Sequence, residues 1–461
     1  MTRQYAPVSP PVALTIAGSD SGGGAGIQAD LKTMEAHDAF GTSVITATTA
    51  QNTTGVHDVN VLPTDHIEAQ YDAVVEDFRV QAIKTGMLAT APVIETVVDC
   101  LNRYERPLVV DPVMVAATGD RLLSEDAEAA YADLIKQSTL VTPNVDEAEI
   151  LTETEIDDAK AAEQAGRELV DQGADAALVK GGHLDGDDVV DTLVVAEADG
   201  EPRTEQFSHP RIETAATHGS GCTLSSAIAA RLARGESLST AVAGGVAFME
   251  RAVRYGIDVG SGPGSVHHLV DLRERADRVA VSDAVEAVVA RLVDRKVETL
   301  VPDIGMGVVG ATRYAETPAE VVGVDGRICR TRSGIRPTAG VRSGGSIGLA
   351  NQLLAARETF PELRFAVNCR FDAGVETALS AVDGPVVESE TADVESDAVE
   401  RVDHTAPVVS IDSESLPDNK PPAAVIDRGS EGRQPGVVLF GTDSETLIER
   451  TLTLYEALIT E

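Results

Sequence analysis

Short apolar runs alternate with helix-period segments through the first part of the chain. The predicted strands are residues 12–17, 43–47, 81–84, 108–110, 140–141 and 177–179. Such an alternation predicts a mostly parallel β-sheet that helices cover on both faces. In sheets of this kind, ligands bind at the carboxyl ends of the strands. We therefore predict an α/β fold with a binding site at one edge of its sheet.

The length of the chain, 461 residues, exceeds what one ordinary hydrophobic core requires and predicts more than one domain. Gly260, Gly262 and Gly264 interrupt the helical pattern that ends near Tyr255. We expect a closing helix over 266–277 and a new helix over 283–297, which places the boundary between residues 270 and 283. The predicted domains are therefore residues 1–275 and 283–461.

The second part of the chain has strand and helix patterns of its own. They predict a second, smaller α/β domain, with strands at 319–324, 365–368, 424–427 and 436–440 and a last helix over 444–458. The acidic stretch 383–403 is interpreted as a solvated loop or helix face. No internal repeat relates the two parts.

The formal charge of the chain is -38, from 75 acidic and 37 basic residues, and the acidic residues are spread along it. An evenly acidic surface stays soluble where salt screens its self-repulsion. We interpret this composition as a halophilic adaptation to a salt-rich cytoplasm; an acidic protein with a basic partner is the alternative. A field of this sign makes nucleic acid a poor partner.

The cysteines and the apolar runs bear on the cellular location of the protein. Cys100, Cys222, Cys329 and Cys369 lie far apart and predict neither a disulfide framework nor a zinc site. Residues 1–11 contain no apolar signal core, and no apolar run approaches the ~20 residues that span a bilayer. We therefore expect a soluble, cytoplasmic protein with no membrane partner.

A glycine-bearing turn at Gly219, Gly221 and Cys222 passes directly into an alanine-rich helix. The first N–H groups of a helix lack internal partners and carry partial positive charge, which suits a phosphate. A helix N-terminus also lowers the pKa of a thiol. A phosphate cradle and a base at Cys222 are therefore predicted together. The alternative is a tight turn that buries a structural cysteine.

Further polar residues follow three of the predicted strands. Asp111 can bind magnesium, Asn144 and Glu147 lie one helical turn apart, and Lys180 can meet phosphate charge. Together with the cradle they meet the needs of phosphoryl transfer. Each also has an ordinary explanation as a turn residue, helix cap, surface acid or solvated strand end. The glycine loop at 18–26 fits neither the P-loop nor the dinucleotide spacing, so we interpret it as a substrate-lining loop.

These motifs resemble those of the bifunctional hydroxymethylpyrimidine kinase/phosphomethylpyrimidine kinase family of thiamine biosynthesis, a branch of the ribokinase-like superfamily. The matching stretches appear in family order between about residues 12 and 268: they are 14–33, 50–53, 84–88, 111–114, 142–148, 180–183 and 219–223. A cysteine at position 222 marks the pyrimidine and pyridoxal kinase branch, so pyridoxal kinase is the alternative activity.

The resemblance implies a ribokinase-like three-layer sandwich that phosphorylates 4-amino-5-hydroxymethyl-2-methylpyrimidine, and then its monophosphate, with ATP and Mg²⁺. It also implies a homodimer. Cys222 would be the base, with Gly219 and Gly221 stabilising the charge on the transferring phosphoryl group. The remaining expected roles are substrate binding by Gln51, Asp30, Met87 and Gly18, nucleotide binding by Lys180, Asn144 and Thr223, and magnesium binding by Asp111 and Glu147.

From about Asp283 the chain resembles the archaeal thiamine-phosphate synthase domain. The resemblance depends on stretches 301–304, 326–327, 368–371, 424–429 and 432–436. Members of that family carry a His and an Arg where Gly348 and Asn351 stand in this chain, and those groups suit a diphosphate. Two hypotheses stay open for this domain: a synthase, and a ligand-sensing domain that regulates the kinase.

Overall fold

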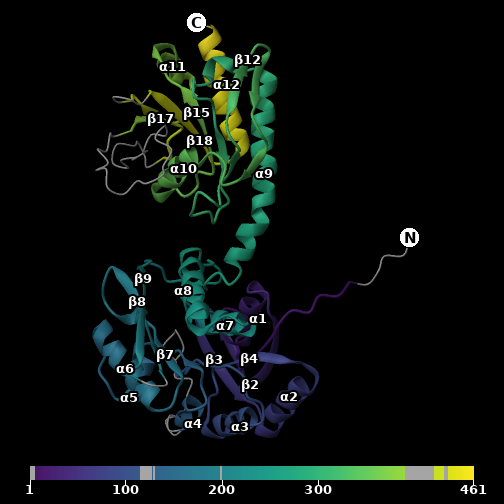
Figure 1. Ribbon diagram of the computed structural model, residues 1–461, viewed down its shortest axis with the longest axis vertical. Helices are drawn as coiled ribbons and strands as arrows, with labels where there is room; N and C mark the ends of the chain where they lie inside the picture. Colours follow the sequence, from purple (N-terminus) through teal and green to yellow (C-terminus); the bar gives the residue numbers. More distant parts are fainter. Residues whose placement is uncertain are drawn as a thin grey trace. The chain divides into compact units, whose positions relative to one another are not determined.

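The computed structural model describes residues 6–114, 127, 130–197, 200–389, 420–429 and 434–460. The chain divides into two compact units, Met1–Val270 and Asp271–Glu461, each with its own sheet and core (Figure 1). The sequence also predicts a helix over residues 124–136. This helix and the acidic stretch 383–403 lie partly outside the described residues.

The first unit contains a nine-stranded sheet in the order β3-β2-β1-β4-β5-β6-β7-β8-β9. Its six central strands are parallel: β1 (Val12–Ser19), β2 (Phe40–Asn52), β4 (Val80–Thr85), β5 (Leu108–Val110), β6 (Leu140–Val141) and β7 (Ala176–Val179). Three strands are antiparallel: β3 (Gly55–Val61) at one edge, β9 (Arg203–Pro210) at the other edge, and β8 (Asp188–Val195) between β7 and β9. The predicted parallel sheet is confirmed, whereas the three antiparallel strands were not predicted.

Helices cover both faces of this sheet. Successive residues of a strand point to opposite faces, so Val110 packs in one hydrophobic cluster and Val109 in another. The Val110 cluster includes side chains of α2 (Thr64–Asp77), α3 (Ala91–Leu101), α4 (Tyr131–Ile135) and α6 (Ala159–Asp171). On the other face lie α1 (Gly26–Ala36), α7 (Ser220–Ala233) and α8 (Leu238–Arg254). The result is the predicted three-layer sandwich.

The predicted pair of helices near the domain boundary is wrong. A single helix, α9 (Val270–Arg295), runs through this region. The stretch contains no glycine or proline to stop it, and Val285, Val288 and Leu292 are fully buried in the core of the second unit. The predicted boundary between residues 270 and 283 therefore lies within one continuous helix, and the compact units divide at its first residue.

The second unit is also α/β, but its seven-stranded sheet is mostly antiparallel, in the order β14-β11-β10-β15-β18-β17-β16. Its strands are β10 (Val308–Gly310), β11 (Val322–Val324), β14 (Val341–Ser343), β15 (Phe365–Arg370), β16 (Val386–Glu388), β17 (Ala424–Asp427) and β18 (Gly436–Gly441). A separate hairpin pairs β12 (Ile328–Thr331) with β13 (Gly334–Pro337). The remaining helices are α10 (Ile347–Thr359), α11 (Ala373–Ala378) and α12 (Ser444–Thr460).

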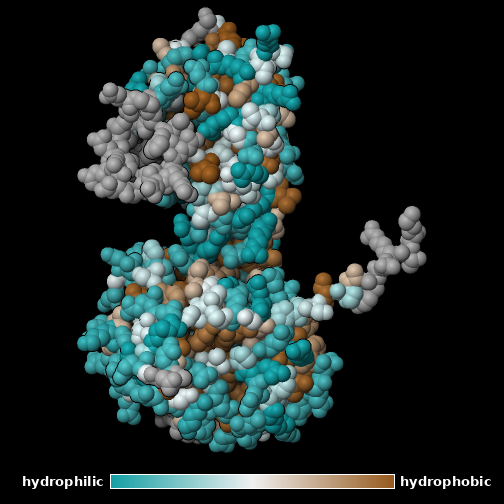
Figure 2. All heavy atoms as spheres, in the orientation of Figure 1, coloured by the Kyte–Doolittle hydropathy of each residue, from teal (hydrophilic) through white to brown (hydrophobic). Residues whose placement is uncertain are grey.

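Hydrophilic residues cover much of the surface visible in Figure 2, as expected for a chain with so many carboxylates. Among the residues that the structure describes, no helix combines the length and the apolar character that crossing a bilayer requires.

Candidate active site

A cavity of about 610 Å³ opens in the first unit where the central parallel strands end. Gly18 lies near the end of β1, Gln51 near the end of β2, and Asp111 directly after β5. The other predicted site residues that line the cavity are Met87, Asn144, Glu147, Lys180, Gly219, Gly221 and Cys222. The fold therefore brings together ten of the predicted residues, all except Asp30 and Thr223.

Lys180 and two carboxylates form a charged cluster in the cavity wall. The Nζ atom of Lys180 lies 3.2 Å from Oδ1 of Asp111 and 4.0 Å from Oε2 of Glu147. Burial raises the pKa of Glu147 to about 7, Lys180 opposes this effect, and Asp111 adds to it. Two buried carboxylates thus share one ammonium group, which leaves the cluster able to accept further positive charge.

Asn144 and Glu147 form a capping box at the start of α5 (Val145–Thr152). The Asn144 side chain accepts a hydrogen bond from the N–H of Glu147, and Glu147 Oε2 accepts one from the N–H of Asn144, both at 2.9 Å. Asn144 is therefore a helix cap as well as a cavity residue. The ordinary alternative for Glu147, a surface acid, is wrong because this residue is buried.

The first turn of α7 closes one side of the cavity. Gly219 adopts a left-handed conformation with φ 81°, and a Cβ there would lie 1.9 Å from the carbonyl oxygen of Gly24. A Cβ on Gly221 would lie 3.2 Å from Nζ of Lys180 and 3.4 Å from Oδ2 of Asp111. The glycines therefore allow the helix N-terminus to approach both the glycine loop and the charged cluster.

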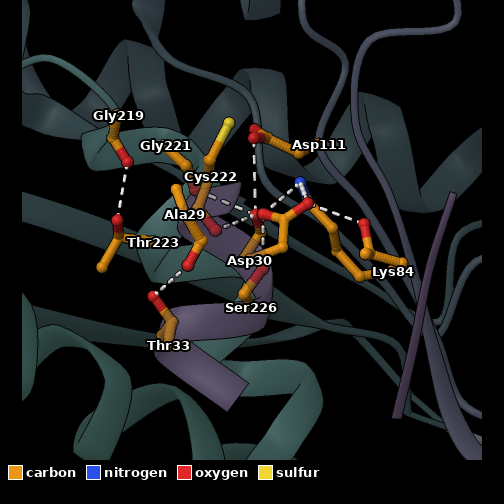
Figure 3. Close-up of polar contacts among 12 residues, drawn as sticks. Ala29, Asp30, Thr33, Lys84, Asp111, Gly219, Gly221, Cys222, Thr223 and Ser226 are labelled. Carbon is orange, nitrogen blue, oxygen red and sulfur yellow. Dashed lines mark hydrogen bonds and ion pairs between the residues drawn. The ribbon is translucent and has the colours of Figure 1, made fainter. Parts of the chain in front are cut away.

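Thr223 does not contact the cavity, contrary to its predicted role in nucleotide binding. It is fully buried, and its hydroxyl group donates a 2.8 Å hydrogen bond to the carbonyl oxygen of Gly219 (Figure 3). A helical side chain points back over the preceding turn, so Thr223 stabilises the turn at Gly219 from its buried side.

The expected lowering of the Cys222 pKa is also wrong. Burial raises the pKa of the thiol to about 11, and the opposing effect of Lys84 is smaller. The helix N-terminus therefore does not dominate the environment of Cys222, and the thiol is protonated at neutral pH in the ligand-free site. Cys222 still lies in the cavity wall close to Asp111 (Figure 3).

Asp30 lies beneath the cavity and not in its wall, which corrects its predicted contact with substrate. Its carboxylate is 0 % exposed and accepts hydrogen bonds from Lys84 Nζ at 2.9 and 3.0 Å. The hydroxyl group of Thr15 donates to it at 2.6 Å. That of Ser226 donates to it at 2.7 Å (Figure 3). Because these donors satisfy it, Asp30 connects α1, β1, β4 and α7 under Cys222.

A hydrogen-bonded contact between His218 and Asp20, which the sequence did not predict, holds the glycine loop. Nε2 of His218 lies 3.1 Å from Oδ2 of Asp20, and the N–H groups of Gly22, Gly24 and Ala25 donate to the same carboxylate. Burial acts to raise the pKa of Asp20, but His218 and these N–H groups outweigh it, and the pKa is lowered. An Asp that precedes glycines is a turn signal that could have indicated this role.

Part of the cavity wall beside Lys180 comes from β8 and from the end of β9, which the sequence did not predict. Asp191 on β8 accepts a 2.9 Å hydrogen bond from the N–H of Gly181. Arg211, next to β9, donates to the carbonyl oxygens of Gly182 at 2.9 Å and Gly186 at 2.8 Å. These contacts fix the loop that follows Lys180.

The carboxylates of Asp111 and Glu147 suit a magnesium ion that also binds water and substrate phosphates. The described residues contain no group of three or more His, Cys, Asp or Glu side chains that could hold a metal ion. Magnesium, however, is commonly bound by one or two carboxylates with water and substrate phosphates. Asp111 and Glu147, which share a single ammonium group, match that arrangement.

Comparisons with known proteins agree with the family resemblance found for each of the two parts of the chain. Residues 20–267 match the phosphomethylpyrimidine kinase family model, and residues 284–453 match that of thiamine-phosphate synthase ThiN. The hydroxymethylpyrimidine/phosphomethylpyrimidine kinase of Streptomyces coelicolor is 46% identical over 269 residues, which are 58% of this chain and 98% of the relative. A bifunctional thiamine biosynthesis protein of Geobacter sulfurreducens is 44% identical over 58% of this chain and 54% of the relative.

Solved structures resemble the first unit. An ADP complex of Bacillus subtilis pyridoxal kinase has a TM-score of 0.52 and 32% identity, and the match covers 57% of this chain and 99% of that chain. The Staphylococcus aureus pyridoxal kinase in complex with AMP-PCP and pyridoxal gives the same TM-score and identity, and the match covers 57% of this chain and 94% of that chain.

Proposed function

The chain belongs to the phosphomethylpyrimidine kinase family, and we propose that its cavity is where both phosphorylations of that family take place. The first unit is a hydroxymethylpyrimidine/phosphomethylpyrimidine kinase of thiamine biosynthesis, and the second unit is thiamine-phosphate synthase-like. One observation carries the site assignment. A helix N-terminus, a lysine and two carboxylates meet in the same cavity as Gln51 and Met87.

The charged end of the cavity receives the phosphates of ATP. Lys180 and the N-terminus of α7 supply positive charge, and the structures of related kinases include a complex with an ATP analogue. Asp111 and Glu147 would hold Mg²⁺, which when bound neutralises charge on the phosphates. Asn144 keeps Glu147 in place through the capping box.

The other end of the cavity receives the aminopyrimidine. The Gln51 amide can donate and accept hydrogen bonds at once, which suits an amino group beside a ring nitrogen. Met87 and the backbone at Gly18 line the same end, and a Cβ on Gly18 would lie 2.7 Å from the terminal methyl carbon of Met87. A side chain at position 18 would therefore displace Met87 from the pocket.

Cys222 accepts the proton of the attacking hydroxyl group at Sγ. Its raised pKa makes the thiolate a strong base that is present in small amount at neutral pH. Lys84, held by Asp30, opposes the effect of burial on this pKa. We therefore assign Asp30 and Lys84 to positioning and electrostatic support, with no contact to substrate.

The identity of the phosphoryl acceptor is tested by measuring kinetics with hydroxymethylpyrimidine and with pyridoxal under the same high-salt conditions. The protein should phosphorylate hydroxymethylpyrimidine with a kcat/KM well above that for pyridoxal. A preference for pyridoxal would replace this proposal with the alternative activity, to which the pyridoxal kinase structures give a fold-level link.

For the second unit two roles remain proposals: joining the pyrimidine diphosphate to a thiazole phosphate, or sensing such a ligand. Gly348 is buried and Asn351 exposed in the first turns of α10, where the resembling synthases carry a His and an Arg. Incubation of the protein with pyrimidine diphosphate and thiazole phosphate separates the two roles. Formation of thiamine phosphate supports a synthase, and binding without turnover supports a sensor.

We also propose a homodimer that works in a salt-rich cytoplasm, from the family resemblance and the charge of -38. Sedimentation measured over a range of salt concentrations tests the dimer. Thermal unfolding over the same range tests the salt requirement, since stability should rise with salt.

A further inference from the structure

The stretch Gly260–Gly264 has no role in the proposed chemistry, yet it makes a close contact with a segment far away in sequence. The Oγ1 atom of Thr53, in the turn between β2 and β3, accepts hydrogen bonds from the N–H groups of Ser261 at 3.2 Å and Gly262 at 3.1 Å. A single hydroxyl oxygen thus satisfies two successive N–H groups of the glycine segment.

Glycine is required at two positions for the contact with Thr53 and at a third for closure of the loop itself. A Cβ on Gly262 would lie 1.9 Å from the carbonyl oxygen of Thr53, and one on Gly260 would lie 2.3 Å from Oγ1 of Thr53. A Cβ on Gly264 would lie 2.2 Å from the carbonyl oxygen of Ile257. The alternating glycines are therefore explained by backbone approach and not by a flexible linker.

Thr53 is two residues beyond Gln51, whose side-chain amide we propose forms hydrogen bonds with the aminopyrimidine. The backbone of Gln51 is held as well, because Ser21 Oγ donates to its carbonyl oxygen at 2.6 Å and accepts from its N–H at 2.8 Å. Gln51 therefore lies between two tethers, one to the glycine loop at Ser21 and one, through Thr53, to the segment 260–264.

The segment 260–264 leads directly to the cradle. Ile257 and Ser265 exchange two backbone hydrogen bonds of 2.7 and 3.1 Å, which close the loop. The N–H of Val266 then donates to the carbonyl oxygen of His218, the residue before Gly219. Backbone contacts thus connect the aminopyrimidine end of the cavity to the N-terminus of α7.

We propose that Thr53 is a positioning residue that fixes Gln51 relative to Gly219 and Cys222, so that the acceptor binds with its hydroxyl group at the phosphate end. The proposal rests on the proposed function of the cavity. Thr53 is not among the residues that line the cavity. Its loss should therefore weaken binding of the acceptor and leave binding of ATP unchanged.

The test compares Thr53→Val, which keeps the shape and removes the acceptor oxygen, with Thr53→Ser, which retains the oxygen. We expect Thr53→Val to raise the KM for hydroxymethylpyrimidine about tenfold, as the loss of two ordinary hydrogen bonds predicts. The KM for ATP should change by less than about twofold. Thr53→Ser should restore the acceptor KM.

Thr54→Val is the matched control. Thr54 is exposed, and its hydroxyl group donates a hydrogen bond within the same turn, to Oδ1 of Asn52 at 2.7 Å. Gly262→Ala opens the contact from the other side and should reproduce the Thr53→Val result, so a poorly folded Thr53→Val protein would not leave the proposal untested. An unchanged acceptor KM in both variants, or equal rises for acceptor and ATP, would overturn it. An inactive wild-type protein would instead reject the proposed function.

Discussion

The ammonium group of Lys180 lies 3.2 Å from Oδ1 of Asp111, although the two residues are 69 positions apart in the sequence. Each follows a different parallel strand, and the sheet brings the two strand ends to the same edge. The contact holds a cation beside Gly221 in the first turn of α7, where we propose that the phosphates of ATP bind. The parallel sheet therefore places two of the residues that we propose for phosphoryl transfer next to each other.

Lys180→Met should lower kcat by about a hundredfold to a thousandfold, the usual effect of removing one group that stabilises transition-state charge. Asp111 and Glu147 would also lose the cation that they share. Steady-state kinetics with hydroxymethylpyrimidine measure the effect. Lys136→Met is the control, because Lys136 forms an exposed ion pair with Asp133. An equal loss in both variants would reject a local role for Lys180.

The pH dependence of kcat/KM tests Cys222 as the base. A thiol whose pKa is raised to about 11 is mostly protonated at neutral pH, and its thiolate fraction grows about tenfold with each pH unit below that value. The kcat/KM for hydroxymethylpyrimidine should therefore rise with pH through the alkaline range. Cys222→Ser should be nearly inactive and should not show this rise. A flat profile in the wild-type protein would argue against the thiolate as the base.

The buried pair of Asp30 and Lys84 makes a prediction about stability. Both side chains are 0 % exposed, so Lys84→Met leaves a buried carboxylate without its counter-ion. Loss of one partner of such a pair costs about 3–5 kcal/mol. Urea unfolding in high salt should show a loss of this order, and the double variant Asp30→Asn/Lys84→Met should recover part of it. Equal stability of the two variants would show that the ion pair does not determine the effect.

The sequence predicted those parts of the fold that depend on local pattern. The central strands of the first unit are short apolar runs, and a parallel sheet buried on both faces requires such runs. Strands β8 and β9 were missed because Asp188, Arg203 and Glu205 add charge to two strands that are partly exposed. Helix α9 was divided in two because Ser282 and Asp283 are typical of a helix start, whereas its buried face continues through them.

The sequence predicted those site residues that directly follow strands. It could not predict interactions with residues that only the tertiary fold brings close. Asp111 and Lys180 follow apolar runs, so their meeting could be predicted from the fold class. The burial of Asp30 could not, because its partner Lys84 is 54 residues away and on another element. The raised pKa of Cys222 likewise depends on tertiary burial, which outweighs the local effect of a helix N-terminus.

The most direct measurement is a phosphorus NMR time course of the full chain with hydroxymethylpyrimidine, ATP and Mg²⁺ in high salt. The monophosphate should appear first and then decline as the diphosphate accumulates, with one ADP formed in each step. Cys222→Ala should bind ATP but form neither product at a comparable rate. If the wild-type protein leaves hydroxymethylpyrimidine unchanged, or if Cys222→Ala turns over at nearly the full rate, the account of this site is contradicted.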